Sequence, residues 1–300
     1  MAFSGAFLDH CDNDRTGPLI QSALREPAAR CVVFHNYRPA FDHDGTLLKA
    51  HPSELAGRDL WDPAIIFLGR DAATRRPWFA AHLKSPDNLA DPDDFHDLRN
   101  AAGLMDSQDL AIVGRAQALI DWHGSHGFCA KCGTRSLPSK GAAVRQCTAC
   151  GTEHFPRVNP VAIMLVTHEN NLLLGRQPGW PPGAFSCLAG FASPGEDLEE
   201  ACIREVKEEV GLHVTDVRYL MSQSWPFPSQ LMLGLQCEAK STELTIDPNE
   251  LETARWFTRA EVEAVFSKTG PEEERAFRRP PAFTIAHQLI RAWLENGARD

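Results

Sequence analysis

An acidic segment constrains this 300-residue chain more than any other feature. Residues 190–212, GFASPGEDLEEACIREVKEEVGL, read as a glycine-rich turn and a helix, and they hold seven acidic side chains against two basic ones. The helix is expected to begin near Asp197. Glu205, Glu208 and Glu209 then project from one face, because residues three and four apart are neighbours on a helix surface. The buried side is expected to hold three aliphatic residues: Ile203, Val206 and Val210.

Clustered carboxylates at the end of a helix need compensation. Glu208 and Glu209 lie in the last turn before Gly211, where the helix dipole disfavours negative charge and neighbouring carboxylates repel each other. Arg204 and Lys207 are not expected to neutralise them. The usual partner of clustered carboxylates is a hard divalent cation such as Mg²⁺. The segment therefore predicts a metal site rather than a solvated acidic face.

Four of the nine cysteines form a second pattern, in which two CxxC pairs are separated by fourteen residues and each pair is followed by Gly. Two such knuckles place four thiolates around one tetrahedral Zn²⁺, and this closed coordination predicts a structural rather than a catalytic metal. A redox dithiol is a weaker alternative, because it needs only one pair. The expected ligands of one zinc per chain are Cys129, Cys132, Cys147 and Cys150.

Strand and helix patterns divide the chain into three parts. Residues 1–124 hold short strand-like runs between Pro, Gly and Asp clusters, which predict a smaller α/β or mainly β domain ending in a helix with Ser107 as N-cap. Residues 125–157 contain the cysteine pairs, and residues 158–300 alternate strands and helices as one α/β domain does.

Charge and hydropathy limit the classes of protein that this chain can represent. Its formal charge of -10 argues against wide, nonspecific binding of nucleic acid, although it does not exclude a local basic patch. The start of the chain has no basic, apolar leader, and the apolar runs are far shorter than the roughly 20 residues that cross a bilayer. We therefore expect a cytoplasmic protein without a membrane partner.

The acidic segment resembles the Nudix box, G-x5-E-x7-R-E-U-x-E-E-x-G-U, in which U is aliphatic. All fixed positions match: Gly190, Glu196, Arg204, Glu205, Val206, Glu208, Glu209, Gly211 and Leu212. The resemblance implies an α/β/α sandwich with a mixed sheet that hydrolyses nucleoside diphosphate derivatives with Mg²⁺ or Mn²⁺. It implies catalytic roles for the three box carboxylates, with Glu205 and Glu209 as metal ligands and Glu208 as a ligand or a water-orienting acid. It also implies that Arg204 pairs with a box carboxylate. The further metal ligands implied are the Ala189 carbonyl and Glu250, which is preferred to Glu252.

A second stretch of sequence narrows the choice of substrate. Residues 222–232, SQSWPFPSQLM, resemble the SQPWPFPxS signature of the NADH pyrophosphatase branch, although Ser224 replaces a Pro and Gln230 replaces the second Ser. Trp225 and Phe227 offer flat faces for a base or a nicotinamide ring, and the Gln223 amide can hydrogen-bond. The implied substrate contacts are Phe155, Phe191, Gln223, Ser224, Trp225, Pro226, Phe227, Pro228, Ser229, Gln230 and Ala286.

The resemblance covers nearly the whole chain, and it implies a homodimeric enzyme that hydrolyses NADH or NAD⁺ to NMNH or NMN and AMP. Removal of the NAD cap from RNA 5′ ends by the same chemistry is the nearest alternative. A generic Nudix hydrolase of ADP-ribose or dinucleoside polyphosphates is disfavoured by the SQSWPFP stretch. A nucleotide-sensing regulator that uses its ribbon on DNA is disfavoured by the intact acidic triplet and by the lack of a basic helix-turn-helix pattern.

Overall fold

The computed structural model describes residues 1–5, 8–86, 88–267 and 275–296 of the chain. These residues divide into two compact units. The first comprises Met1–Val158 and Ser224–Ser229, and the second comprises Asn159–Gln223 and Gln230–Asp300. Within the described residues, no helix has both the length and the hydropathy needed to cross a membrane.

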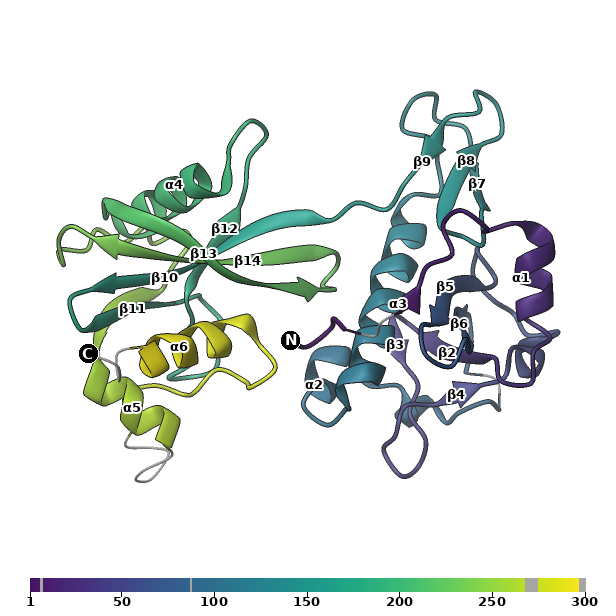
Figure 1. Ribbon diagram of the computed structural model, residues 1–300, viewed down its shortest axis with the longest axis horizontal. Helices are drawn as coiled ribbons and strands as arrows, with labels where there is room; N and C mark the ends of the chain where they lie inside the picture. The colour runs from purple at the N-terminus through teal and green to yellow at the C-terminus, as the bar shows by residue number, and fades with distance from the viewer. Residues whose placement is uncertain (6–7, 87, 268–274, 297–300) are drawn as a thin grey trace. The chain divides into compact units, whose positions relative to one another are not determined.

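The first unit is built on a six-stranded sheet with the order β1-β5-β6-β2-β3, in which β4 also pairs with β2 (Figure 1). β2 and β6 are parallel, and the other pairs are antiparallel. The strands are β1 (Leu8–Asp9), β2 (Arg30–His35), β3 (Arg38–Pro39), β4 (Lys49–Ala50), β5 (Ile66–Asp71) and β6 (Pro77–Leu83). The α-helices are α1 (Gly17–Ala23), α2 (Leu98–Ala101) and α3 (Ser107–Ser125), and two 3₁₀-helices span Pro52–Leu55 and Pro92–Asp94.

Helix α3 corrects one expectation about its start. Its N-cap is Asp106 rather than Ser107, because the Asp106 carboxylate accepts hydrogen bonds from the backbone amides of Gln108 and Asp109. A carboxylate that receives two of the unpaired amides at the start of a helix is a strong cap. Ser107 thus becomes the first residue of the helix.

The cysteine segment folds as a small ribbon within the first unit. Its three antiparallel strands, in the order β7-β8-β9, are β7 (Ser136–Ser139), β8 (Val144–Cys147) and β9 (Glu153–His154). The glycine after each CxxC pair has a left-handed backbone, with φ of 72° at Gly133 and 71° at Gly151. This conformation allows the tight turn of each knuckle, which explains the glycine after each pair.

The second unit contains a six-stranded mixed sheet with the order β13-β14-β10-β11-β15, in which β12 also pairs with β10. β10 and β14 are parallel, whereas β11 and β12 are antiparallel to β10. The strands are β10 (Asn159–His168), β11 (Asn171–Arg176), β12 (Leu188–Phe191), β13 (Val214–Trp225), β14 (Gln230–Ala239) and β15 (Thr253–Thr258). The helices are α4 (Leu198–Val210), α5 (Arg259–Ser267) and α6 (Ile285–Asn296).

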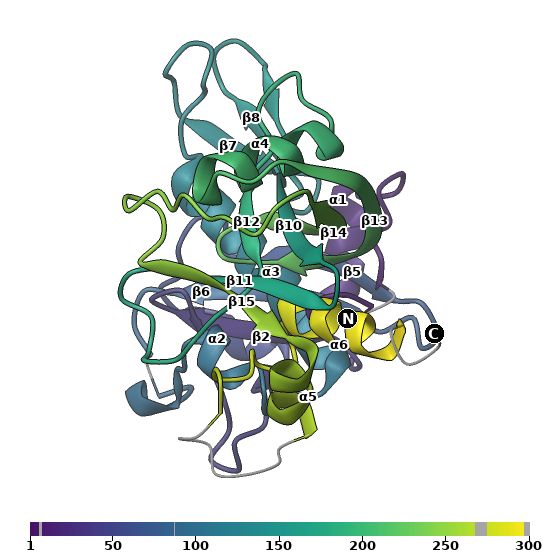
Figure 2. The same cartoon turned by 90° about the vertical axis from the view of Figure 1, so that its left-hand side faces the viewer.

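Helices cover both faces of this second sheet (Figures 1 and 2). Met164 and Leu235 point into the core beneath α4. Gly234, the neighbour of Leu235, faces the other way, because a Cβ there would lie 2.8 Å from a side-chain atom of Leu289 on α6. The alternation of side chains along each strand therefore supplies an apolar surface to both layers. The expected α/β/α sandwich is confirmed.

Candidate active site

Helix α4 begins and ends where the sequence predicts. The Asp197 carboxylate caps it by accepting from the amide of Glu200, and the Glu200 side chain accepts in return from the Asp197 amide. The helix ends at Gly211, whose φ is 75°. Its buried stripe holds Ala201, Cys202, Val206 and Val210. Ile203 is 39% exposed, contrary to expectation.

Three carboxylates converge at the buried edge of α4. Glu205, Glu209 and Glu250 each offer an oxygen atom, and these oxygens lie within 4.8 Å of one another. The alternative residue, Glu252, instead pairs with the Arg176 guanidinium at 3.2 Å. Glu205, Glu209 and Glu250 are all metal ligands that the family resemblance implies, and the structure brings them together.

The cluster carries negative charge in a poorly solvated place. Glu209 is only 4% exposed. Burial, and then the charges of Glu205 and Glu250, raise the pKa of Glu209 to about 8, although a backbone hydrogen bond from Ala189 opposes the shift. Partial desolvation and the charge of Glu205 also raise the pKa of Glu250. A bound divalent cation would remove this penalty, and an all-oxygen donor set suits Mg²⁺ or Mn²⁺.

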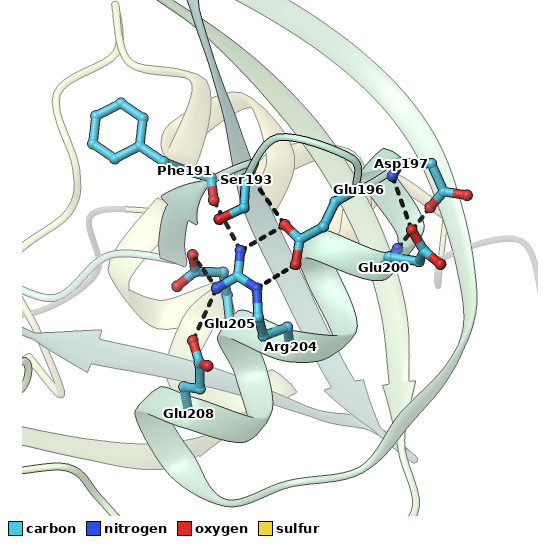
Figure 3. A network of polar contacts seen from close by, with 8 residues as sticks. All are labelled: Phe191, Ser193, Glu196, Asp197, Glu200, Arg204, Glu205 and Glu208. Atoms are coloured by element: carbon cyan, nitrogen blue, oxygen red, sulfur yellow. Dashed lines mark hydrogen bonds and ion pairs between the residues drawn. The ribbon is translucent and has the colours of Figure 1, made fainter.

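Arg204 organises the other side of the acidic segment (Figure 3). Its Nη1 atom donates to Glu205 at 2.8 Å and to Glu208 at 2.9 Å. Its Nε and Nη2 atoms donate to the two oxygens of Glu196 at 2.5 and 2.8 Å, and Nη2 also donates to the Phe191 carbonyl. The expectation that Arg204 leaves these acids unneutralised was therefore wrong for Glu205 and Glu208, since the side chain folds back against the box loop.

Glu208 lies apart from the carboxylate cluster. Its side chain is 54% exposed and is bound to Arg204, and it is not among the acids whose oxygens converge. This placement does not support direct metal ligation by Glu208 and leaves the water-orienting role as a prediction. Residues three apart on a helix are displaced by about 60° around its axis, which separates Glu208 from Glu205.

Strand β12 brings the backbone close to the cluster. Gly190 pairs with Ala162 of β10, and a Cβ at Gly190 would lie 1.9 Å from the Glu205 carboxyl carbon. Any side chain at this position would displace Glu205, which explains the glycine at the start of the box. The Ala189 carbonyl, the further predicted ligand, lies on the same strand.

The stretch SQSWPFPSQLM, residues 222–232, is divided between the two units. Gln223 belongs to the second unit, is 1% exposed, and uses both ends of its amide. Its Nε2 atom donates to the Phe283 carbonyl at 2.7 Å, and its Oε1 atom accepts from the Ile285 amide at 2.7 Å. The Gln223 side chain thus holds the start of α6, and its contact with substrate stays a prediction.

The aromatic residues of the stretch pack within the first unit. The Trp225 and Phe227 rings lie 5.1 Å apart, and both meet the edge or face of the Phe3 ring, at 5.8 and 5.6 Å. The Arg99 guanidinium lies 4.5 Å from the Phe227 ring centre. Phe227 therefore packs in this cluster, and its contact with a ligand stays a prediction. Trp225 is half-buried.

The other predicted substrate contacts differ in exposure. Phe155 and Phe191 are each 53% exposed, as stacking positions require. Ala286 is buried in the first turn of α6, and the Ser229 hydroxyl donates to the Arg157 carbonyl at 2.5 Å. The remaining positions are exposed at Pro228, half-buried at Ser224 and Gln230, and buried at Pro226. Their contacts with substrate stay predictions.

The four ribbon cysteines converge, with all four sulfurs within 4.8 Å of one another. The Sγ–Sγ distances are 3.7 Å for Cys129–Cys150, 3.4 Å for Cys132–Cys147 and 3.5 Å for Cys132–Cys150. A tetrahedron with Zn–S bonds of about 2.3 Å has edges of about 3.8 Å. The sulfurs therefore fit one zinc ion, and no cysteine forms a disulfide.

Three family models match the chain in succession. They are a "NADH pyrophosphatase-like rudimentary NUDIX domain" over residues 28–122, a "NADH pyrophosphatase zinc ribbon domain" over 125–155 and a "NUDIX domain" over 156–279. The NAD-capped RNA hydrolase NudC of Mycobacterium tuberculosis is 36% identical over 95% of this chain and 92% of its own.

Two human relatives match the chain over shorter regions. The NAD-capped RNA hydrolase NUDT12 is 43% identical over 62% of this chain, and the mitochondrial NAD(P)H pyrophosphatase NUDT13 is 39% identical over 67%. The chain spans 42% of the length of NUDT12 and 59% of the length of NUDT13.

Proposed function

Since this chain belongs to the Nudix family, in its NADH pyrophosphatase branch, we propose that it hydrolyses the pyrophosphate of NADH and NAD⁺ to NMN(H) and AMP. The observation that carries the proposal is the cluster of Glu205, Glu209 and Glu250. A buried carboxylate with a raised pKa beside two further acids suits a divalent cation, and pyrophosphate oxygens are natural partners of such a cation. The name of NUDT13 describes the same reaction class.

The proposal gives each side chain of the site a different role. Glu205, Glu209 and Glu250 would hold the cation, and Arg204 would keep Glu205 and Glu208 in place. Glu208, which is more exposed, would orient the attacking water. Bound Mg²⁺ or Mn²⁺ would supply charge neutralisation at the pyrophosphate and a lower pKa for bound water. Phe155 and Phe191 would stack against the rings of the dinucleotide.

Removal of the NAD cap from RNA is the second candidate function. The names of NudC and NUDT12 both state this activity, and NudC matches nearly the whole chain. The bond cleaved is the same pyrophosphate, so the two substrates differ only in whether the adenosine continues into an RNA strand. Both are compatible with one catalytic centre.

A product assay on NADH, NAD⁺, ADP-ribose and NAD-capped RNA, run side by side, tests the proposal. We expect AMP and NMN(H) from the dinucleotides, 5′-monophosphorylated RNA from the capped transcript and slower turnover of ADP-ribose. ADP-ribose turned over faster than all nicotinamide substrates would contradict the proposal and favour a generic Nudix hydrolase.

The choice between Mg²⁺ and Mn²⁺, the cytoplasmic location and the homodimer belong to the same proposal. Carboxylate oxygens suit both cations. Nine unpaired cysteines are typical of a reducing compartment. The dimer follows from the branch resemblance, and light scattering of active protein should give about twice the chain mass of 33.2 kDa. A value near the chain mass at assay concentration would refute it.

A further inference from the structure

The first unit contains a cavity that the proposed reaction does not use. Its volume is about 310 Å³, within the range of small-molecule sites. It is lined by the turn after β2, by residues near the start of β5, by the end of β6, and by the passage from α3 into the ribbon. Residues so distant in sequence form one concave surface only in the folded unit.

Three large aromatic side chains on the wall of this cavity face solvent. Tyr37 is 46% exposed, Trp61 52% and Phe128 70%. Across the described ranges, the other exposed aromatic residues are Phe155, Phe191 and Tyr219. Two of those three are predicted substrate contacts, so half of the exposed aromatic residues gather at a cavity without an assigned ligand. Such a concentration of exposed apolar surface marks a binding site.

The fold holds these rings in place. Tyr37 has a φ of 60°, which is rare for a bulky residue. Gly124 makes room for its hydroxyl, because a Cβ there would lie 2.6 Å from the Tyr37 Oη atom. The His82 ring lies 4.8 Å from the Tyr37 ring and 6.2 Å from the Trp61 ring. The Tyr37 and Trp61 rings are thus arranged before any ligand binds.

Polar groups complete the lining. Arg145 is 1% exposed and donates to Asp62 at 2.9 Å and to the Nδ1 atom of His123 at 3.0 Å. Burial lowers the pKa of both His82 and His123 to about 4, so each imidazole is neutral at pH 7. Both nitrogens of His123 are used within the unit, since Nε2 bonds the Ala142 carbonyl at 2.8 Å and Nδ1 bonds Arg145, so its imidazole positions Arg145. Arg135 also lines the cavity, and its side chain is 67% exposed.

The ribbon beside the cavity is basic, although the chain is acidic. Residues 125–157 hold five Lys or Arg side chains and one acidic side chain, whereas the whole chain has a formal charge of -10. Four thiolates and one Zn²⁺ contribute a charge of −2, which leaves a positive excess. A ligand with an anionic group is therefore favoured over a neutral or cationic one.

We propose that this cavity binds a nucleoside monophosphate unit, with its base against Tyr37, Trp61 and Phe128 and its phosphate near Arg135. Flat rings stack on aromatic side chains regardless of base identity, and a guanidinium is a good partner for phosphate. The unit can be a free mononucleotide or one nucleotide of a single-stranded RNA. The basic ribbon favours the RNA strand, because a strand offers further phosphates to the same surface.

Binding measurements on the full chain test this assignment. The Glu209→Gln background prevents turnover, and the probes are AMP and an uncapped, single-stranded ten-nucleotide RNA. Trp61→Ala and Phe128→Ala should each weaken binding at the cavity about 5-fold or more, from the scale of base stacking. Tyr219→Ala is the matched control, since Tyr219 is also 53% exposed but lies in the second unit. It should leave binding unchanged.

Cross-linking of an RNA that carries 4-thiouridine locates the bound base independently. Adducts at Tyr37, Trp61 or Phe128 support the assignment. If Trp61→Ala and Phe128→Ala weaken the binding of RNA but not of AMP, the ligand of the cavity is a nucleotide within an RNA strand. If they weaken the binding of AMP but not of RNA, the ligand is a free mononucleotide. Equal affinities in all variants, or adducts confined to the second unit, overturn it.

Folding and catalysis are checked in the same variants. Zinc content and thermal melting verify the fold, and Phe128→Ala carries the test if Trp61→Ala does not fold, because Phe128 is 70% exposed. With Glu209 intact, Phe128→Ala should retain the parent kcat/KM on NADH. A fall in that value equal to the fall in RNA affinity would place Phe128 in the catalytic site instead and overturn the separate cavity.

Discussion

At the scale of single residues, the active site depends on where charge is neutralised and where it is not. Arg204 shares its guanidinium among Glu196, Glu205 and Glu208. Glu209 receives a backbone hydrogen bond from Ala189 and lies beside two further acids. Burial of an ionisable group without a partner is costly. A bound cation would therefore relieve the largest electrostatic cost at Glu209.

If Glu209 holds the cation as proposed, Glu209→Gln should lower turnover of NADH by about 100-fold or more, because it removes the charge of that ligand. The same change should leave the metal-free protein as stable as the parent or more stable, since it removes a buried, repelled charge. Steady-state kinetics at saturating Mg²⁺ and thermal melting with chelator measure the two effects. Glu199→Gln, on the exposed face of α4, is the control, and near-parent turnover in Glu209→Gln would show that the cluster was misread.

His82 should make the stability of the first unit depend on pH. Its pKa is lowered from 6.5 to about 4 in the folded state, so the unfolded chain binds more protons between these values. The free energy of unfolding therefore falls as pH decreases from 6.5 to 4. In His82→Gln, this part of the decrease should disappear. Urea denaturation at several pH values, compared with the parent, measures the difference, and parallel pH profiles for the two proteins would contradict it.

At the scale of elements, the residues of the hairpin of β13 and β14 are divided between the two units. Its strands belong to the second sheet, while Ser224–Ser229 at its end belongs to the first unit. Pro226 and Phe3 both approach Gly114 of α3, where a Cβ would lie 3.4 Å from Pro226 and 3.0 Å from Phe3. The absence of a side chain in the middle of α3 thus leaves space for the hairpin end.

Within this hairpin, Trp225 and Phe227 should respond differently to truncation. Trp225→Ala should lower kcat/KM for NADH by roughly 5- to 100-fold, and less for ADP-ribose, which lacks the nicotinamide ring. Phe227→Ala should chiefly lower stability, by about 2 kcal/mol, because the ring packs against Phe3 and Arg99. Kinetics and urea denaturation separate the effects. If Trp225→Ala hydrolyses NADH like the parent, the ring is only a packing residue.

At the scale of the whole molecule, two domains with different sources of stability form one chain. The second unit has a core between its sheet and α4. The first unit has its own core, which lies around its six-stranded sheet. The ribbon within it has short strands, so the four thiolates are expected to contribute much of its stability through the metal.

Zinc removal should therefore affect stability and Mg²⁺ removal should affect turnover. We expect one zinc per chain by elemental analysis, retained under mild chelation that abolishes NADH hydrolysis reversibly. Stripping the zinc with a strong chelator should lower the melting temperature of the first unit, because folding and zinc binding are linked. Fully active, zinc-free protein would refute this role for the ribbon.

Local patterns in the sequence were sufficient for much of this protein. The capped helix α4, the two knuckles and the α/β character of the second unit are explained by the spacing of carboxylates, cysteines and apolar residues, whereas the α/β/α sandwich was implied by the family resemblance. Those spacings act over a few residues, and each has a local energetic basis in helix capping, metal ligation or strand alternation. The resemblance of these same residues to a known family supplied the function and the choice of Glu250.

Only the tertiary structure decided how side chains are used. The sequence could not reveal that Gln223 holds the start of α6, that Phe227 packs on Phe3 and Arg99, or that Arg204 binds Glu205 and Glu208 at once. The cavity around Trp61 was equally hidden. These features depend on contacts between segments far apart in the chain and on the direction of each side chain. Periodicity along one element defines a face, but the partner of that face is set by the packing of the whole unit.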